Sequence, residues 1–550
     1  MTHRKERISR FVCLLLLCSL SFNAVSAGAQ QTPEPQRERR VVTSSATARV
    51  APASAPKTVE ELRTRIREIL SSPPLAPALV AVKAVSLDTG HTLFEENAGK
   101  LLVPASNMKM YTVAAALDRL TPDFRWKTSV YAPAPPDASG TIRGDLIVYG
   151  RGDPSLAASF YDGDYTKAID ELAERIAAAG VRRIEGALVG DEAYFKGPPY
   201  GASWEWDDLQ WYYGAEVSAL TVNDNAIDLF VKPGASVGAA CIVTTGPSPL
   251  PHITISNHAT TAPRGTRRDL TVYRGLAENL IEVSGSLPLD DKGYTGEVAI
   301  ARPAQTFVDL LRASLLRRGI NVTGQARILD PRARESASPD VSKLVEIASR
   351  PSPPLSVVAA KTLKPSQNLY TELILRTLGE GVGRVSPLAA VPLSAETQTT
   401  PPRTKQTSAE AGIDIVKAFL NSAGVDAGSV RMSDGSGLSR HDLVTANASV
   451  QLLTYISRRP YANAFRDALP IAGVDGTLAN RMKNTAATGN IRAKTGTVEF
   501  VASLSGYATT AAGERLVFSI MVNNYTGGAD VRRSYIDAIA ELLASFSGRS

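Results

Sequence analysis

The chain has 550 residues, of which 44% are hydrophobic and 21% are charged, and its formal net charge is +6. This length exceeds one ordinary core, so we expect two to four domains of globular composition. The mild positive charge suits an anionic polymer or a phospholipid surface as partner. No Lys/Arg run with interleaved aromatic residues occurs in the sequence, which argues against nucleic acid as a partner.

Residues 1–29 are predicted to be a signal peptide. Basic residues between His3 and Arg10 precede an apolar stretch from Phe11 to Phe22, and small residues around Ala27 follow. This stretch is shorter than the roughly 20 residues of a membrane-spanning helix, so cleavage is favoured over an uncleaved anchor. We therefore expect an extracytoplasmic protein, in the periplasm or cell envelope, with at most loose membrane association.

The next segment, residues 30–57, is rich in Pro, Arg, Ser, Thr and Ala without apolar periodicity, which predicts a disordered linker. Apolar periodicity begins directly after it. The elements predicted up to residue 120 are a helix over 59–70, strands over 78–86 and 92–96, and a helix after Pro104 with Ser106 in its first turn.

Between residues 125 and 339 the pattern changes to short β-like runs separated by Gly and Pro, with one helix over 165–179. We interpret this stretch as an insertion of one or two β-rich domains. The Pro/Thr/Ser-rich segment 385–408 is predicted to be a mobile loop. The remaining predicted elements are helices at 366–378 and 411–423, antiparallel strands at 491–497, 501–508 and 515–522, and a helix at 531–546.

These elements predict that residues 58–124 and 340–550 form one α/β domain, split by the insertion. Of the three cysteines only Cys241 lies outside the predicted signal peptide, so no internal disulfide is expected, and its side chain is interpreted as a small buried apolar group. The histidines lack metal-ligand spacing. We predict no metal site and no cofactor.

Three short motifs contain the candidate catalytic and substrate-binding residues. Ser106 and Lys109 are three residues apart, hence on one helical face, where an amine can deprotonate a hydroxyl. A lysine can act as a base near neutral pH only if burial or a second cation, such as Lys494, lowers its pKa. Taken alone, Ser-x-x-Lys is a weak motif that also occurs by chance.

The other two motifs suit substrate binding. Lys494, Thr495, Gly496 and Thr497 are expected at a strand edge, with a cation for a carboxylate, two hydroxyls, and a glycine that lets a substrate backbone approach. The Ser366-Gln-Asn368 motif precedes an apolar helix, so in isolation it also fits a helix cap.

The order of these motifs resembles the class C low-molecular-mass penicillin-binding proteins, the D-alanyl-D-alanine carboxypeptidase/endopeptidase family. The resemblance runs from about Val59 to the C-terminus, and the large insertion between the first two motifs is itself a mark of the family. Flanking matches are Pro104-Ala-Ser106, Gly152-Asp-Pro-Ser-Leu156, Asp434-Gly-Ser-Gly-Leu-Ser439 and Asp475-Gly-Thr-Leu478. It implies a β-lactamase/transpeptidase-like domain, an antiparallel sheet with helices on both faces, interrupted by the β-rich insertion.

The resemblance also implies roles. Ser106 is the expected nucleophile, Lys109 its base, and Ser366 the proton relay to the leaving amine. Asn368 is expected to bind the substrate amide, and the Lys494–Thr497 motif its terminal carboxylate. The backbone N–H groups of Ser106 and Thr497 would form an oxyanion hole. The implied partners are peptidoglycan peptides and β-lactam inhibitors.

One segment departs from the family. Some members carry an acidic residue just before a Trp-rich stretch of the insertion, whereas Phe195 to Trp204 contains none. The loop Asp434–Ser439 is interpreted as structural, because its glycines suit a tight turn. A β-lactamase or esterase on the same scaffold stays open as an alternative, although no motif indicates a deacylating base. A catalytically silent wall-binding protein is the other alternative.

Overall fold

The computed structural model describes residues 55–247, 250–330, 340–385, 406–526 and 532–550. The predicted signal peptide, nearly all of the predicted linker and most of the predicted mobile loop lie outside these residues. The described residues belong to one structural unit, Arg49–Ser550.

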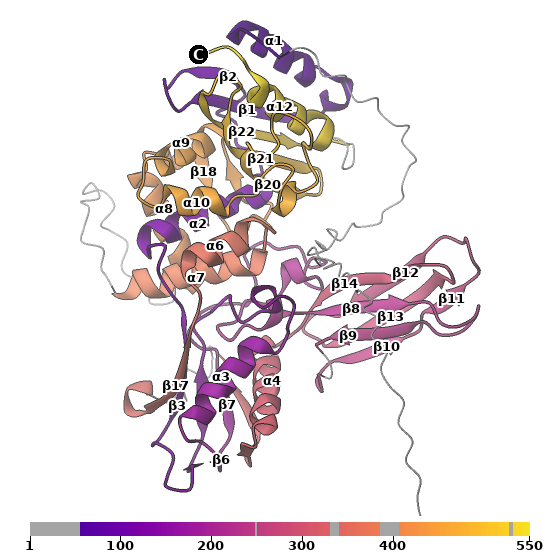
Figure 1. The fold of residues 1–550 in the computed structure, drawn as a ribbon, viewed down its shortest axis with the longest axis vertical. Coiled ribbons are helices and arrows are strands. Elements are labelled where there is room, and N and C mark those ends of the chain that lie inside the picture. Colours follow the sequence, from indigo (N-terminus) through magenta and orange to yellow (C-terminus); the bar gives the residue numbers. More distant parts are fainter. Residues whose placement is uncertain (1–54, 248–249, 331–339, 386–405, 527–531) are drawn as a thin grey trace, which may run out of the picture. The chain divides into compact units, whose positions relative to one another are not determined.

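A five-stranded sheet joins the two ends of the described chain (Figure 1). All of its neighbouring strands are antiparallel, and strands near the N-terminus lie beside strands near the C-terminus, with Leu79 opposite Asn523 and Ser86 opposite Leu516. In spatial order the strands are β2 (Thr92–Glu96), β1 (Leu79–Ser86), β22 (Arg515–Asn523), β21 (Val501–Thr509) and β20 (Arg492–Val498). Within the described residues β20 is therefore an edge strand, whose outer side has one isolated bridge, between Arg492 and Ile471.

Helices cover both faces of this sheet, as predicted, because side chains alternate between faces along each strand. In β1, Val80 and Val82 pack on one face with α1 (Val59–Leu70) and α12 (Asp537–Ser545). Ala81 faces the other cluster. That cluster holds α2 (Met108–Arg119), α6 (Leu355–Leu363), α7 (Asn368–Val385), α8 (Ser408–Ser422), α9 (Ala446–Ile456) and α10 (Ala462–Ala468).

Part of the intervening chain forms an α/β unit with its own core. Its larger sheet has the order β16 (Ala326–Leu329), β7 (Leu188–Asp191), β5 (Leu146–Tyr149), β3 (Lys127–Ala132) and β17 (Val345–Pro351), and a smaller one has β15 (Asn321–Val322), β6 (Arg183–Ile184) and β4 (Thr141–Ile142). Two helices pack on this core, α3 (Lys167–Ala178) and α4 (Pro303–Arg317). The expectation of one helix was wrong. Apolar residues at helical spacing (Phe307, Leu311, Leu315) did signal α4.

A second, all-β group shares another core that contains Leu229, Cys241 and Val283. Cys241 is 4% exposed and packs as the predicted small apolar group. One sheet has the order β14 (Tyr294–Ala299), β8 (Ala226–Lys232) and β9 (Ile242–Gly246). The other has β10 (Thr254–Asn257), β13 (Leu280–Pro288) and β11 (Thr260–Ala262), with β12 (Asp269–Arg274) also paired to β13.

The predicted domain boundaries stay predictions. Strand β17 lies within the range assigned to the split α/β domain, yet it pairs with β3 of the insertion. We therefore place the second boundary, as a proposal, after Pro351 rather than at residue 339. The chain then enters the insertion near Lys127 and leaves it near Pro351. These two residues are register partners in the β3–β17 pair, so the two connections lie close together.

Candidate active site

The predicted nucleophile lies in a tight turn before a buried helix. Ser106 belongs to a 3-10 turn, Ala105–Asn107, which leads directly into α2, so it precedes the first α-helical turn instead of lying in it. Ala105 has a left-handed φ of 47°, unusual for a residue with a Cβ. Gly437 packs closely against this turn, since a Cβ on Gly437 would lie only 1.9 Å from the Ala105 carbonyl oxygen.

Lys109 is fully buried and is hydrogen-bonded to parts of three segments. Its Nζ lies 2.9 Å from Ser106 Oγ, 2.6 Å from Asn368 Oδ1 and 2.7 Å from the Ser436 carbonyl oxygen. The amide oxygen and the carbonyl can only accept hydrogen bonds. A neutral amine has two N–H donors, which these two acceptors use, so its lone pair is left for the proton of the Ser106 hydroxyl.

The surroundings of Lys109 bring its pKa down toward neutral pH. Burial lowers the pKa of Lys109 to about 7, while the carboxylates of Asp434, Glu372 and Asp442 act in the opposite direction. Of the two causes considered from the sequence, burial is the one that the structure identifies.

The loop Asp434–Ser439 holds the acceptor that Lys109 needs. The Asp434 carboxylate accepts hydrogen bonds from the backbone N–H groups of Gly437 (2.7 Å) and Ser439 (3.1 Å). Gly437 has φ +79°, so the turn requires glycine there. This agrees with the structural role predicted for the loop. The sequence did not reveal that the Ser436 carbonyl contacts the predicted base.

The second lysine, Lys494, is also fully buried, on the edge strand β20. Its Nζ donates to Ser366 Oγ at 2.8 Å and to the Thr495 carbonyl at 2.9 Å. Ser366 has φ +69° in the turn before α7, and Thr495 Oγ1 lies 2.7 Å from Thr477 Oγ1. The third predicted motif therefore contacts the second.

Gly496 faces the nucleophile turn. A Cβ at this position would lie 2.5 Å from the Pro104 carbonyl, 3.1 Å from the Ser106 nitrogen and 2.2 Å from Ser503 Oγ. Ser503 Oγ itself donates to the Pro104 carbonyl at 2.7 Å. The glycine thus lets β20 pack against the turn that carries Ser106. The sequence predicted that Gly496 allows a substrate backbone to approach, but it did not predict this packing between β20 and the Ser106 turn.

All the predicted site residues meet in this region. Asn368 connects two segments, because its Oδ1 accepts from Lys109 and its Nδ2 donates to the Tyr213 carbonyl at 2.9 Å. Thr497 is on β20 opposite Ala502, one residue beyond Gly496. The sequence analysis included Ser436 and Thr477 within the flanking matches but gave neither a role at the site, and it did not consider Glu372. The signal for Glu372 was its position one helical turn after Asn368.

The insertion reaches the same loop. Trp204 Nε1 donates to Asp434 Oδ2 at 2.7 Å, and Arg440 Nε donates to Glu205 Oε1 at 3.0 Å. The segment Phe195–Trp204 has no acid, as noted from the sequence, but Glu205 follows it immediately. A carboxylate of the insertion therefore lies beside the loop that holds Ser436.

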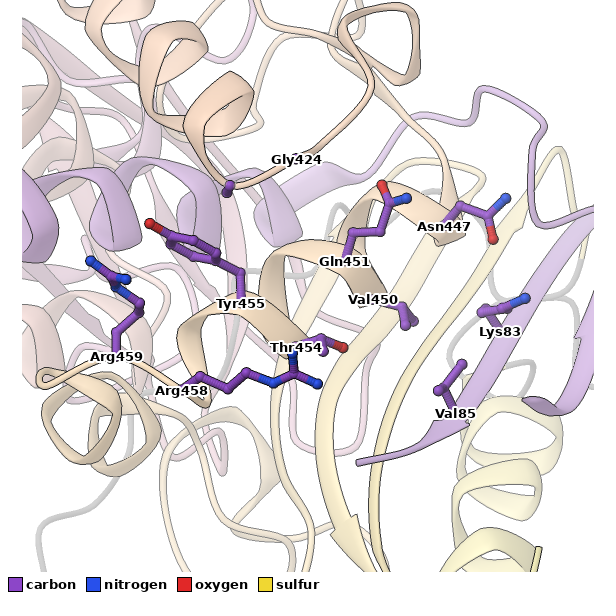
Figure 2. A pocket seen from close by; sticks show the side chains of 11 residues that line it. Lys83, Val85, Gly424, Asn447, Val450, Gln451, Thr454, Tyr455, Arg458 and Arg459 are labelled. Carbon is purple, nitrogen blue, oxygen red and sulfur yellow. The ribbon is translucent and has the colours of Figure 1, made fainter. Parts of the chain in front are cut away.

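A cavity of about 650 Å³ lies elsewhere, along one face of α9 (Figure 2). Figure 2 shows Asn447, Gln451 and Thr454 of this helix on one side and Lys83 and Val85 of β1 on another. None of the predicted site residues lines it.

A hydroxyl–histidine–carboxylate arrangement at α4, away from these residues, is structural. His252 lies 2.8 Å from Thr306 Oγ1 and 3.0 Å from Asp309 Oδ2, and both partners are on α4. Thr306 is 2% exposed, so its hydroxyl is closed to a substrate. The contacts tie the His252 segment to the helix.

Within the described ranges, no group of three or more His, Cys, Asp or Glu side chains is placed to hold a metal ion. Among the same residues, every helix is too short or too polar to cross a membrane.

The sequence matches the model of the D-Ala-D-Ala carboxypeptidase 3 (S13) family over residues 62–546. It is 32% identical over 549 residues to the D-alanyl-D-alanine carboxypeptidase of Actinomadura sp. (strain R39), covering 94% of each chain. It is 25% identical over 454 residues to the D-alanyl-D-alanine carboxypeptidase DacB of Haemophilus influenzae, covering 81% of this chain and 85% of the relative. The fold is similar to the crystal structure of penicillin binding protein 4 (dacB) from Haemophilus influenzae, with a TM-score of 0.71, 23% identity, and coverage of 88% and 99%.

Proposed function

Since the chain belongs to the D-Ala-D-Ala carboxypeptidase 3 (S13) family of serine hydrolases, as its motifs predicted, we propose that it cleaves D-Ala-D-Ala peptides through an acyl-enzyme on Ser106. The observation that carries this proposal is the contact of Lys109 Nζ with Ser106 Oγ at 2.9 Å, in a setting that lowers the pKa of Lys109 to about 7. The substrate is the stem peptide of peptidoglycan.

In the first step Ser106 Oγ attacks the carbonyl carbon of the scissile bond, and its proton passes to Lys109 Nζ. The backbone N–H groups of Ser106 and Thr497 stabilise the oxyanion, each worth about 3 kcal/mol. Gly496 supports this pair, since it packs β20 against the Ser106 backbone.

In the second step the scissile C–N bond breaks, and the proton that Lys109 took from Ser106 passes through the Ser366 hydroxyl to the amine of the leaving D-alanine, which leaves Lys109 neutral again. Lys494 Nζ, 2.8 Å from Ser366 Oγ, holds that hydroxyl in place. Lys494, Thr495 and Thr497 hold the carboxylate of that D-alanine, and Asn368 binds the peptide amide. The free edge of β20 suits this, because an extended peptide can pair with an edge strand. Water then releases the acyl group from Ser106.

Two finer points belong to the same proposal. We place the mature protein outside the cytoplasm, from the predicted signal peptide at residues 1–29. A β-lactam, whose ring carbonyl and carboxylate imitate the peptide, would acylate Ser106 and leave slowly. One solved structure that this fold resembles is titled as a complex of penicillin binding protein 4 with a β-lactam (TM-score 0.66, 21% identity). We include endopeptidase cleavage of cross-links in the proposal, since it uses the same acyl-enzyme chemistry.

The test is release of free D-alanine from a pentapeptide ending in D-Ala-D-Ala, measured for the wild type, Ser106→Ala and a control, Ser457→Ala, at the end of α9. We expect release by the wild type and the control and none by Ser106→Ala. Rapid turnover of a penicillin without D-alanine release would favour the β-lactamase alternative. No reaction of the wild type with either compound would favour the silent wall-binding alternative.

A further inference from the structure

A buried carboxylate lies behind the proposed base, on the helix that already contacts it. Asn368, Glu372 and Arg376 succeed one another at four-residue steps on α7, so they share one face of the helix. They are 7%, 0% and 2% exposed. The first of them binds Lys109 directly. The catalytic steps above make no use of the second.

Glu372 is also connected to Lys109 through the loop Asp434–Ser439. Its Oε1 accepts the backbone N–H of Gly435 at 2.8 Å, and the Gly435 carbonyl accepts from Thr112 Oγ1 at 2.9 Å. The next residue is Ser436, whose carbonyl binds Lys109 Nζ at 2.7 Å. One side chain thus fixes the peptide next to the contact that orients the amine.

The carboxylate is more than a backbone anchor, because its other oxygen is enclosed without a hydrogen bond in the described part of the chain. Burial raises the pKa of Glu372 to about 7, and the negative charge of Glu372 raises the pKa of Lys109. Among the described residues, the other charged groups that act on this pair are Asp434 of the loop, Asp442 shortly after it, and Arg376 of α7.

We propose that Glu372 is a positioning residue for Lys109, which holds the Ser436 carbonyl against Nζ and supplies the negative charge that stabilises the ammonium formed when Ser106 gives up its proton. This inference rests on the proposed function. Glu372 and Lys109 then titrate as a coupled pair, so the fall of the acylation rate on the acid side reports the apparent pKa values of the pair and not that of Lys109 alone.

The test uses the acylation rate of a fluorescent penicillin as a function of pH. Glu372→Gln keeps an oxygen that can accept from Gly435 but removes the charge. We expect its acid limb to move to lower pH by roughly one pH unit and its plateau rate to fall, because the ammonium loses a nearby opposite charge. Glu372→Asp retains the charge on a shorter side chain, so its limb stays in place while its plateau falls.

The matched control is Glu380→Gln, the same change two turns further along α7, where the carboxylate accepts from Ser408 Oγ at 2.5 Å. Its limb and plateau should equal those of the wild type. A folded Glu372→Gln variant with an unmoved limb would overturn the inference. If that variant does not fold, a limb that moves in Glu372→Asp overturns it instead. Absence of label on the wild type at every pH is a different result and refutes the proposed function.

Discussion

Two fully buried lysines belong to the candidate active site, one on a helix and one on an edge strand, and their surroundings differ. On the helical side, Lys109 touches an amide oxygen, a carbonyl and a hydroxyl, and three carboxylates influence its charge. On the strand side, Lys494 touches the Ser366 hydroxyl and a carbonyl of its own strand. The first environment suits an amine that gains and loses a proton. The second suits a cation at the edge of a sheet.

Burying a lysine costs free energy unless its amine is hydrogen-bonded. The difference between the two environments explains why this protein keeps two buried lysines. A proton acceptor has to be desolvated to lower its pKa, and it needs acceptors that orient its lone pair. A carboxylate receptor has to present positive charge to an open strand edge. We therefore expect the two lysines to fail in different ways when changed.

The largest effect is expected from Lys109→Met, which keeps the length of the side chain and removes the amine. General-base catalysis is worth about 10²–10⁴-fold, so acylation by penicillin should slow by about 10³-fold. Stopped-flow labelling measures it, with Lys100→Met at an exposed position as control. A loss below tenfold would mean that Lys109 is not the base.

Next in size is the change Gly437→Ala, which acts on the helical side alone. The new Cβ would lie 1.9 Å from the Ala105 carbonyl in a residue with φ +79°. We expect about 10²-fold slower acylation and a loss of stability of about 2 kcal/mol in thermal unfolding. Gly424→Ala separates the two causes, because Gly424 has φ +75° with nothing within 4 Å, so it should cost about 1 kcal/mol and leave acylation unchanged.

The pH dependence of the wild type distinguishes the two lysines without mutation. The pKa of Lys109 is lowered to about 7, so the amine is neutral above that pH and protonated below it. Acylation should therefore rise with pH through about 7 and fall toward tenfold per pH unit below it, steepening where Glu372 titrates as well. Lys494→Met should keep the same limb. A limb that moved in Lys494→Met would contradict the division of roles.

Lys494→Met itself should weaken reaction with anionic substrates by about 10–100-fold, the worth of a charge-assisted hydrogen bond. The comparison that sharpens this is a pentapeptide with a C-terminal amide in place of the carboxylate. On the amide peptide, the wild type should react little faster than Lys494→Met. The variant should react with the two peptides at nearly the same rate. Equal loss on both peptides would show that Lys494 does not read the carboxylate.

The smallest effect is expected from Thr477→Val, which removes the hydroxyl that lies 2.7 Å from Thr495 Oγ1. A neutral hydrogen bond contributes about 1 kcal/mol, so kcat/KM for D-alanine release should fall about fivefold or less. Thr485→Val in a neighbouring loop serves as the control. A loss above a hundredfold would give Thr477 a direct role in binding.

Much of the split sheet was predictable, because its strands are short runs of small and apolar residues and its helices have clear apolar spacing. The strands at 491–497, 501–508 and 515–522 match β20, β21 and β22 to within one residue. The helix α4 was missed even though Phe307 and Leu311 signalled it. The pairing of β17 with β3 joins residues more than 200 positions apart in sequence, and no local pattern encodes such a pairing.

For the site, the residue types and their order could be read from the motifs, but their support could not. Ser436 contributes only a carbonyl, which any residue has, and Glu372 resembles other helical glutamates until its burial is known. The role predicted for Gly496, close approach of a substrate, stays a prediction, and its contact with the Pro104 carbonyl and the Ser106 nitrogen was not foreseen. These roles depend on contacts between distant segments, which only the folded chain shows.

The central claim is that Ser106 is the residue that becomes acylated. Its most direct test is peptide mapping by mass spectrometry after brief exposure of the wild-type protein to benzylpenicillin. The account predicts one added penicilloyl group, on the peptide that contains Ser106, and no addition to Ser106→Ala. An adduct on any other peptide, or an equal adduct on the Ala variant, would contradict it.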